Sequence, residues 1–403
     1  MSEWKCYKLN EISSLSNGIN FDKSAYTSGV KLIGVSDFKK RIHPDYDSLQ
    51  EVDSKVVKSG DYLEKGDIVF VRSNGNKELV GRCMIIDRHI PVTYSGFCIK
   101  LRLKDKKRFE PAFFNYLFKT RQFKKSMTGT AVGANIQNLS QSRLGSCEVN
   151  VPDIETQKRI ATILSRYDSL IENYQKQIKL LEEAAQRLYK EWFVDLYFPG
   201  HENTKIVDGV PEGWEKKSIG EIGTVITGKT PSTSNKENYG GSIPFITIPD
   251  MHTGIYPVSS VFLSEKGAES QSKKYIPKDA LIVSCIGTAG LVCITKERCQ
   301  TNQQINSLIL DDKEMLHYMY FVFLSLKEHL NNIGSNGATM TNVNKSKFEG
   351  IDIVVPSSCI IRDFSQRTTP YFENIKSLQS QLRLLTEARD RLLPKLLSGE
   401  IEI

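Results

Sequence analysis

The sequence predicts an α+β protein: two similar mixed α/β domains joined by two long antiparallel coiled-coil helices, with approximate internal twofold symmetry. Two observations lead to this fold class. Residues 154–196 and 357–403 both carry mostly apolar side chains at a seven-residue spacing, which forms a seam that needs a partner helix. The segments before these two stretches share short patterns. A chain of 403 residues is long enough for two to three domains with separate cores.

The order of elements follows from these patterns. The first domain contains β-like runs and one expected helix at Pro111–Ser126. The β-like runs are Lys31–Ser36, Asp67–Arg72, Cys83–Ile86 and Phe97–Leu103. We predict a first domain at 1–153, a central long helix at 154–200, a second domain at 201–355 and a C-terminal long helix at 356–403.

The repeat extends into the domains. Leu9-x-Glu11-Ile12, which leads to Gly18, matches Ile219-x-Glu221-Ile222, which leads to Gly228. The loops after Gly18, Arg72 and Thr128 diverge most from their counterparts. Divergent loops on a shared scaffold indicate two domains that recognise two different things.

The heptad stretches predict how the helices meet. The seam positions are Ile160, Tyr167, Tyr174, Leu181 and Leu188 in the first helix, and Phe364, Tyr371, Leu378, Leu385 and Leu392 in the second. A companion series of residues, also seven apart, begins at Leu164 in the first helix and at Thr368 in the second. Because both copies lie in one chain, an intramolecular pair is favoured over a dimerisation coiled coil, which stays an alternative. Pro370 is expected to begin a fresh helical stretch at its first position.

Charge is uneven along the chain. The net charge is +7, and residues 1–150 hold 25 Lys and Arg against 16 Asp and Glu. The densest basic stretch is Lys100–Lys125. It indicates either a surface for a polyanion such as DNA or an ordinary solvated helix face.

The cysteines and the hydropathy indicate an intracellular, cytoplasmic protein without membrane contact. Eight scattered cysteines contain no Cys-x-x-Cys pair, which is typical of reduced thiols and gives no metal site. The six histidines show no metal-ligand spacing either. The start has no signal segment, and the longest apolar run, Tyr318–Leu326, is about half a membrane span.

One complete catalytic motif is rejected. Gly223–Thr230 matches the phosphate-loop pattern G-x-x-x-x-G-K-T. That loop must begin a helix whose N-terminus receives phosphate, and here Pro231 and a polar, glycine-containing segment follow. We therefore expect no catalytic residue in this chain, and any linked activity on another subunit. A Lys229→Ala variant would test the rejected ATPase reading.

Polar loop residues are the better candidates for contacts with DNA. Asn and Gln pair with adenine in two hydrogen bonds, and Arg and Lys pair with guanine. The candidates are Lys23, Arg72, Asn74, Lys77, Asn135 and Gln137 in the first domain, and Lys229, Thr230, Thr288, Gln303, Thr339 and Asn342 in the second.

Four segments together resemble one family. They are Gln157–Ile171 with its Gln-Lys-Arg-Ile-Ala-Thr-Ile-Leu string, Arg187–Phe193, Pro211–Trp214 and Arg391–Gly399. Over essentially its full length the chain resembles the specificity subunits of type I restriction–modification enzymes. The second helical repeat departs from the pattern, because Ile361–Ser365 replaces the Gln-Lys-Arg-Ile-Ala string and Pro370 follows.

The resemblance implies two target-recognition domains in inverted orientation. Each would read one half of a split, asymmetric site in double-stranded DNA. The helices would dock two methyltransferase (modification) subunits that methylate adenine and, indirectly, motor-nuclease (restriction) subunits. S-adenosylmethionine, ATP and magnesium would be bound by these partners, and this chain would hold no cofactor.

Two alternatives remain open at this stage. One is a coiled-coil scaffold that does not bind DNA, and the other is a DNA-binding regulator without a modification partner. A regulator should carry a compact helix-turn-helix, and the sequence shows none. The recognised bases cannot be derived, because recognition depends on loop conformation and DNA bending.

Overall fold

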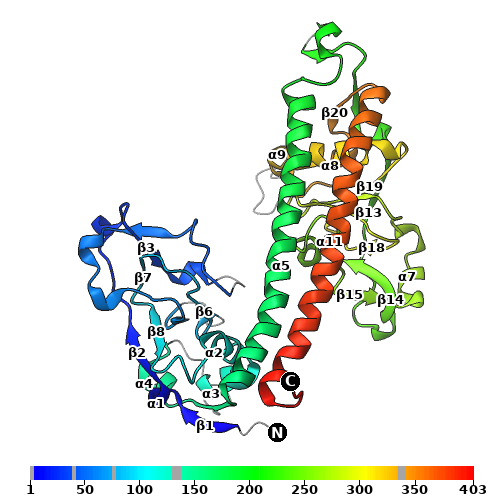
Figure 1. Cartoon of the computed structure of the whole chain (residues 1–403). Helices are drawn as coiled ribbons and strands as arrows, with labels where there is room; N and C mark the ends of the chain where they lie inside the picture. Colours follow the sequence, from blue (N-terminus) through cyan, green and yellow to red (C-terminus); the bar gives the residue numbers. More distant parts are fainter. Residues whose placement is uncertain (1–3, 39–41, 75–78, 129–137, 208, 335–341) are drawn as a thin grey trace. The chain divides into compact units, whose positions relative to one another are not determined.

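The computed structural model describes residues 4–38, 42–74, 79–128, 138–207, 209–334 and 342–403. The chain forms two compact units (Figure 1). Unit 1 comprises Met1–Glu172 and Leu384–Ile403, and unit 2 comprises Asn173–Arg383. Each unit therefore combines one α/β domain with one part of each long helix. Because the units divide within helices, the boundaries predicted at residues 153, 200 and 355 remain predictions.

The domain of unit 1 is built from two main sheets. One has four antiparallel strands in the order β2-β8-β5-β6, and the other has three in the order β4-β3-β7, with β3 and β7 parallel. A separate pair joins β1 to β9. The strands are β1 (Lys5–Lys8), β2 (Ser13–Asn17), β3 (Val30–Ile33), β4 (Gln50–Val52), β5 (Ile68–Val71), β6 (Cys83–Ile85), β7 (Val92–Tyr94), β8 (Cys98–Leu103) and β9 (Glu148–Val151).

The domain of unit 2 repeats this plan strand for strand. Its sheets have the orders β13-β19-β16-β17 and β15-β14-β18, with β14 and β18 parallel, and β12 pairs with β20. A short hairpin joins β10 (Ile206–Val207) to β11 (Val210–Pro211). The other strands are β12 (Glu215–Ser218), β13 (Gly223–Thr227), β14 (Tyr239–Ile246), β15 (Val261–Leu263), β16 (Leu281–Ser284), β17 (Val292–Ile294), β18 (Gln300–Thr301), β19 (Ile305–Leu310) and β20 (Asp352–Val355).

Two glycines show why the repeated motif ends where it does. A Cβ atom on Gly18 would lie 2.3 Å from the carbonyl oxygen of Ser95, and one on Gly228 would lie 2.2 Å from that of Asn302. Only glycine allows the backbone to approach another strand this closely. The predicted internal repeat and the α+β fold class are therefore confirmed, down to matching close approaches.

The domain helices are short. In unit 1 they are α1 (Leu9–Ile12), α2 (Pro111–Leu117), α3 (Arg121–Thr128) and α4 (Gln141–Gly145). In unit 2 they are α6 (Ile248–Met251), α7 (Glu265–Glu269), α8 (Leu316–Ser325), α9 (Lys327–Gly334) and α10 (Lys345–Glu349). The single helix expected at Pro111–Ser126 is wrong. Thr120 ends one helix and caps the next, because its Oγ1 accepts a hydrogen bond from the Phe123 amide at 3.2 Å.

Two long helices follow the domains, as predicted. They are α5 (Ile154–Tyr189), continued by a π-helical turn at Lys190–Val194, and α11 (Ser358–Ser398). The expected break at Pro370 is wrong, because α11 runs through it. Pro370 and Gln366, whose carbonyl loses its usual amide partner, are both exposed, so water can satisfy that carbonyl. In the preceding turn the Thr369 hydroxyl donates to the Ser365 carbonyl at 2.7 Å.

The long helices pack together antiparallel within each unit. In unit 1, Ile160 of α5 shares a core with Leu392 of α11, and in unit 2, Leu188 of α5 shares a core with Phe364 of α11. The companion series lies deeper than the seam in α5. Its members Leu164, Ile171, Ile178, Ala185 and Trp192 are all less than 10% exposed. Of the seam positions, Ile160 is 1% exposed, and the other four, Tyr167, Tyr174, Leu181 and Leu188, are half-buried. Each domain core and the partner helix therefore cover the companion face more fully.

Six of the eight cysteines are buried, and all eight are free. Burial raises the pKa of the Cys293 thiol to about 12, which keeps it protonated and unreactive. Among the described residues no group of His, Cys, Asp and Glu could hold a metal ion. None of the described helices has the length and apolar content needed to cross a bilayer.

Candidate nucleic-acid interface

Strand register gathers the predicted residues of unit 2 at one edge of the four-stranded sheet. Thr227 at the end of β13 pairs with Asn306 near the start of β19. Ser284 at the end of β16 pairs with Ile305, so the turn from β16 to β17 opens at the same edge. We call this edge, with the loops that leave it, the reading edge of unit 2.

Five of the predicted side chains lie on the reading edge of unit 2. Lys229 and Thr230 follow β13, Thr288 lies in the turn after β16, and Gln303 precedes β19. Asn342 pairs with Ile286 through an isolated bridge. Thr339 lies outside the described residues.

Hydrogen bonds hold part of this set in place. The Thr230 hydroxyl donates to Oε1 of Gln303 at 2.6 Å, and the Lys229 amide donates to the Thr301 carbonyl at 2.9 Å. Lys229, Thr288, Gln303 and Asn342 are exposed. The edge therefore presents exposed hydrogen-bond donors and acceptors of the kind that can pair with bases.

Unit 1 has the matching reading edge. Asn17 pairs with Ile99 and Val71 with Cys98, so the loop after β5 opens beside the start of β8. Arg72 and Asn74 lie on this loop. The neighbouring Ser73 pairs with Asn138, which is the counterpart of the bridge between Ile286 and Asn342.

The remaining predicted residues of unit 1 are placed differently. Lys23 is exposed in a short 3₁₀ turn, Lys23–Ala25, on the connection from β2 to β3. Lys77, Asn135 and Gln137 lie outside the described residues.

Sequence reasoning missed Phe97 on the reading edge of unit 1. Its side chain is 54% exposed, although the sequence pattern predicts that Phe97 begins a strand. Its carbonyl accepts hydrogen bonds from the amides of Arg72 at 2.7 Å and Ser73 at 3.3 Å. The signal was the Ser95-Gly96 turn directly before it, which places Phe97 at a loop tip.

The densest basic stretch has a different role from both expected ones. Lys100 is 6% exposed, and its ammonium group donates to the Gly60 carbonyl at 2.9 Å. Arg102 forms hydrogen bonds with Asp67 at 2.8 and 2.7 Å, and Lys104 donates to the carbonyls of Asn10 and Glu11. These cations join parts of the domain to one another. Arg121 and Lys124 on α3 are exposed cations of this stretch.

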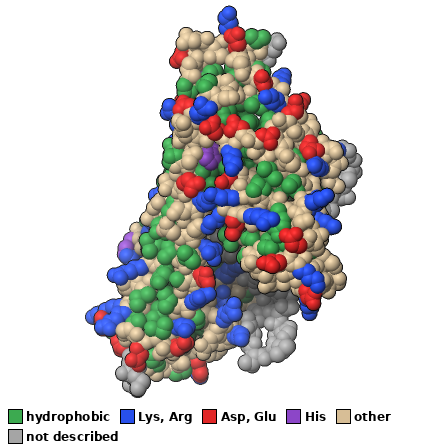
Figure 2. Space-filling model, turned by 90° about the vertical axis from the view of Figure 1, so that its right-hand side faces the viewer, with side chains coloured by type: hydrophobic (Ala, Val, Ile, Leu, Met, Phe, Trp, Pro, Cys, Tyr) green, Lys and Arg blue, Asp and Glu red, His purple; other side chains and the backbone are tan. Residues whose placement is uncertain are grey.

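The distribution of charge does not identify a DNA-binding surface on every face of the molecule. On the face shown in Figure 2, basic and acidic side chains are interspersed with apolar ones. The case for DNA contact therefore rests on the reading edges.

The segment that matches the phosphate-loop motif is not followed directly by an α-helix. Its glycine-to-threonine segment forms strand β13 up to Thr227, and the next helical residues are a 3₁₀ turn at Lys236–Asn238. No helix N-terminus follows Lys229 to receive a phosphate.

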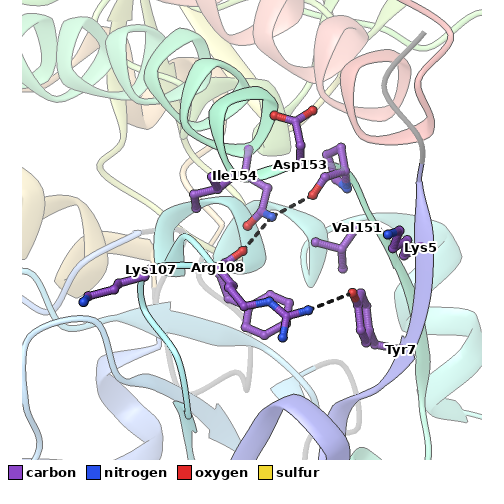
Figure 3. Close-up of a pocket in the computed structure, with 10 residues that line it drawn as sticks. Lys5, Tyr7, Lys107, Arg108, Val151, Asp153 and Ile154 are labelled. Carbon is purple, nitrogen blue, oxygen red and sulfur yellow. Dashed lines mark hydrogen bonds between the residues drawn. The ribbon is translucent and has the colours of Figure 1, made fainter.

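A cavity of about 290 Å³ lies where α5 begins (Figure 3). Lys107 and Arg108 line it, and the Arg108 guanidinium donates to the Tyr7 hydroxyl at 3.4 Å. Asp153, which caps α5 through the amides of Glu155 and Thr156, also lines it. The helix N-terminus is thus already satisfied by a carboxylate of the chain.

Comparison with known proteins identifies the family. The profile described as "Type I restriction modification DNA specificity domain" matches residues 1–183 and 211–366. The chain belongs to the family of type I restriction–modification specificity subunits. It matches the profile twice, in agreement with the repeated domain.

Individual members of the specificity-subunit family agree. The HindI specificity subunit of Haemophilus influenzae is 32% identical, with 100% of both chains covered. The MjaIX specificity subunit of Methanocaldococcus jannaschii is 30% identical over 72% of this chain and 69% of its own. The crystal structure of the S subunit from M. genitalium has a TM-score of 0.68 at 17% identity, covers 98% of this chain and 96% of its own, and shows the shared fold.

The family string at the start of α5 has a structural role here. Gln157 is 1% exposed; its Oε1 accepts from the Glu110 amide at 2.9 Å, and its Nε2 donates to the carbonyls of Arg108 and Pro152. These bonds fix the start of α5 against the loop that leads into α2. At the corresponding place in α11 stands Ile361, 2% exposed, so the second helix is anchored by apolar contact.

Proposed function

We propose that this chain is the DNA sequence-specificity subunit of a type I restriction–modification complex that recognises a split, asymmetric site in double-stranded DNA. The observation that carries the proposal is the pair of reading edges. Both units have the same strand order, and each presents its own set of polar side chains at the same sheet edge. Each edge would read one half of the site.

The two reading edges carry different side chains, so they would recognise different bases. This supports a DNA site with two unlike halves. Unit 1 offers Arg72 and Asn74, with Arg suited to guanine and Asn to adenine. Unit 2 offers Thr288, Gln303 and Asn342. The exposed cations Arg121 and Lys124 on α3 would contact phosphates, which supply affinity without sequence information.

The long helices would serve the partners. We propose that α5 and α11 dock two methyltransferase subunits and that restriction subunits attach through these. The partners would bind S-adenosylmethionine, ATP and magnesium and carry out adenine methylation and ATP-dependent cleavage. This chain would supply no catalytic group, and it would act in the cytoplasm, at the nucleoid, wherever its complex meets DNA.

Selection from a random duplex library tests the proposal. The chain, assembled with its methyltransferase subunits, should enrich duplexes with two short defined halves separated by an undefined spacer. Exchange of residues 201–355 for those of another member should change one half alone. Enrichment of one continuous palindromic motif would contradict the split site. The lack of any salt-dependent affinity for DNA would favour the scaffold alternative, because contacts with phosphates release counterions.

The rejected hypothesis of ATP hydrolysis at the phosphate-loop motif is tested separately. Lys229→Ala should leave ATP hydrolysis by the isolated chain at the background level of the wild type. Hydrolysis by the wild type that this substitution abolishes would restore the phosphate loop as a functional site.

A further inference from the structure

One buried amide connects the loops of the reading edge of unit 2. Asn306 is 2% exposed in β19, among strands that are otherwise largely apolar. Its Oδ1 accepts from the Thr227 hydroxyl at 2.7 Å, and its Nδ2 donates to the Val343 carbonyl at 3.1 Å. A buried amide is costly unless its groups are paired, and here both ends are paired.

The hydrogen bonds continue from Asn306 around the edge. The Val343 amide donates to the Cys285 carbonyl at 2.9 Å, and the Cys285 amide donates to the Gln304 carbonyl at 2.8 Å. Each of these residues lies close in sequence to a predicted reading side chain. Thr227 is two residues before Lys229, Val343 follows Asn342, Cys285 is three before Thr288, and Gln304 follows Gln303.

The fold itself does not require an amide at this position. In unit 1 the register pair that corresponds to Thr227 and Asn306 is Asn17 and Ile99. Ile99 is fully buried and apolar in the same strand position. Asn is also depleted in strands, so its presence calls for a role other than sheet stability.

We propose that Asn306 is a positioning residue for base recognition by unit 2. Its side chain joins Thr227 to Val343, and the backbone of Val343 is bonded in turn to that of Cys285. Through this chain it fixes the geometry of the segments that carry Lys229, Thr288, Gln303 and Asn342. Bidentate contacts with bases need such a fixed geometry. The inference rests on the proposed function, since it assigns a role within that DNA site.

The test measures discrimination, which is the ratio of the affinities for cognate DNA and for DNA substituted in one half-site. It is measured for each half-site separately. Asn306→Ile places the unit 1 residue in unit 2, and Thr227→Val removes one of the two hydrogen bonds at a partly exposed position. The matched control is Thr295→Val. Thr295 is fully buried, and its hydroxyl donates to the Pro277 carbonyl at 2.7 Å, at the end of β17 away from the reading edge.

The full chain with its methyltransferase subunits would be titrated with cognate DNA and with DNA substituted in one half. The half read by unit 2 is the one that changes when residues 201–355 are exchanged. Asn306→Ile should lower discrimination in that half by about tenfold, leaving the other half unchanged, since a good base contact is worth about 1–3 kcal/mol. Thr227→Val should lower it in the same direction, and Thr295→Val should leave both halves unchanged while lowering the melting temperature.

Unchanged discrimination in folded Asn306→Ile would overturn the inference, as would an equal loss in both halves. If Asn306→Ile does not fold, Thr227→Val decides by the same criterion. A wild-type complex that discriminates among no duplexes would instead overturn the proposed function, so the two failures are distinguishable.

Discussion

In unit 1 the Arg389 guanidinium of α11 donates to Oδ1 of Asp168 in α5 at 2.7 Å. The other carboxylate oxygen of Asp168 accepts from the Tyr116 hydroxyl of α2 at 2.6 Å. Burial and the neighbouring carboxylate raise the pKa of Tyr116 above its usual value, so this hydroxyl remains a donor. Three helices of unit 1 thus meet at one carboxylate, which is only 7% exposed.

Removal of the arginine should be costly. Arg389→Ala leaves the Asp168 carboxylate buried with one partner, and we expect a loss of about 2 kcal/mol in the free energy of unfolding. Urea unfolding followed by circular dichroism measures this loss. The matched control is Arg391→Ala, because Arg391 pairs with Glu387 on the same helix and is exposed. Equal losses for the two variants would show that the pair with Asp168 is no better than a surface pair.

A second prediction concerns pH. Burial lowers the pKa of His317 from 6.5 to about 4. Its ring stacks on Phe372 with centroids 4.0 Å apart, and its Nδ1 lies 3.0 Å from the Thr368 hydroxyl. Between these two pKa values the unfolded chain binds a proton that the folded chain does not. Stability should therefore fall as the pH is lowered from about 6.5 to 4, by a contribution on the order of 3 kcal/mol.

His317→Phe provides the matched control for the pH effect. The imidazole ring of His317 lies flat on the Phe372 ring, so a phenyl ring of similar shape suits this packing. The variant should lose the part of the pH dependence between 6.5 and 4 and keep the rest. A melting temperature with the same pH slope in variant and wild type would rule out His317 as its source.

Pro370 gives a third prediction. It lies exposed within the continuous helix α11 and supplies no amide to the Gln366 carbonyl. Pro370→Ala should restore that hydrogen bond and raise the free energy of unfolding by about 1–3 kcal/mol. Thermal unfolding measures the gain. A lower melting temperature would mean that α11 depends on the bend that proline favours.

Arg72 and Lys124 should differ in their effect on DNA binding. Arg72→Ala, at the reading edge of unit 1, should lower discrimination at one position of one half-site by about 1–3 kcal/mol. Lys124→Ala, on the exposed face of α3, should weaken binding to all duplexes alike and reduce the salt slope by about one. Binding titrations over a range of salt concentrations separate the two effects. Identical behaviour of the variants would remove the distinction between base and phosphate contacts.

Much of the architecture follows from periodicity and repetition. The seven-residue spacing predicts both long helices, and the matching motifs that end at Gly18 and Gly228 predict two copies of one domain. Errors arose where one side chain decides the local structure. Thr120 splits the helix expected at Pro111–Ser126, and solvent exposure lets α11 continue through Pro370.

The candidate site was predicted in part. Loop composition indicated Arg72, Gln303 and Asn342, and strand register places them on the two reading edges. Composition did not predict the role of the basic stretch. Lys100 and Arg102 form hydrogen bonds with residues of the same domain that are distant in sequence. The role of Asn306 also depends on its partners Thr227 and Val343, which only the fold brings together.

The most direct test of the central claim is a map of adenine methylation across a genome. Cells would carry the partner methyltransferase subunit with or without this chain. We predict a split motif with two short defined halves that appears only when this chain is present. No such motif, in cells where the two proteins are shown to be bound together, would contradict the claim that this chain directs methylation to a DNA sequence.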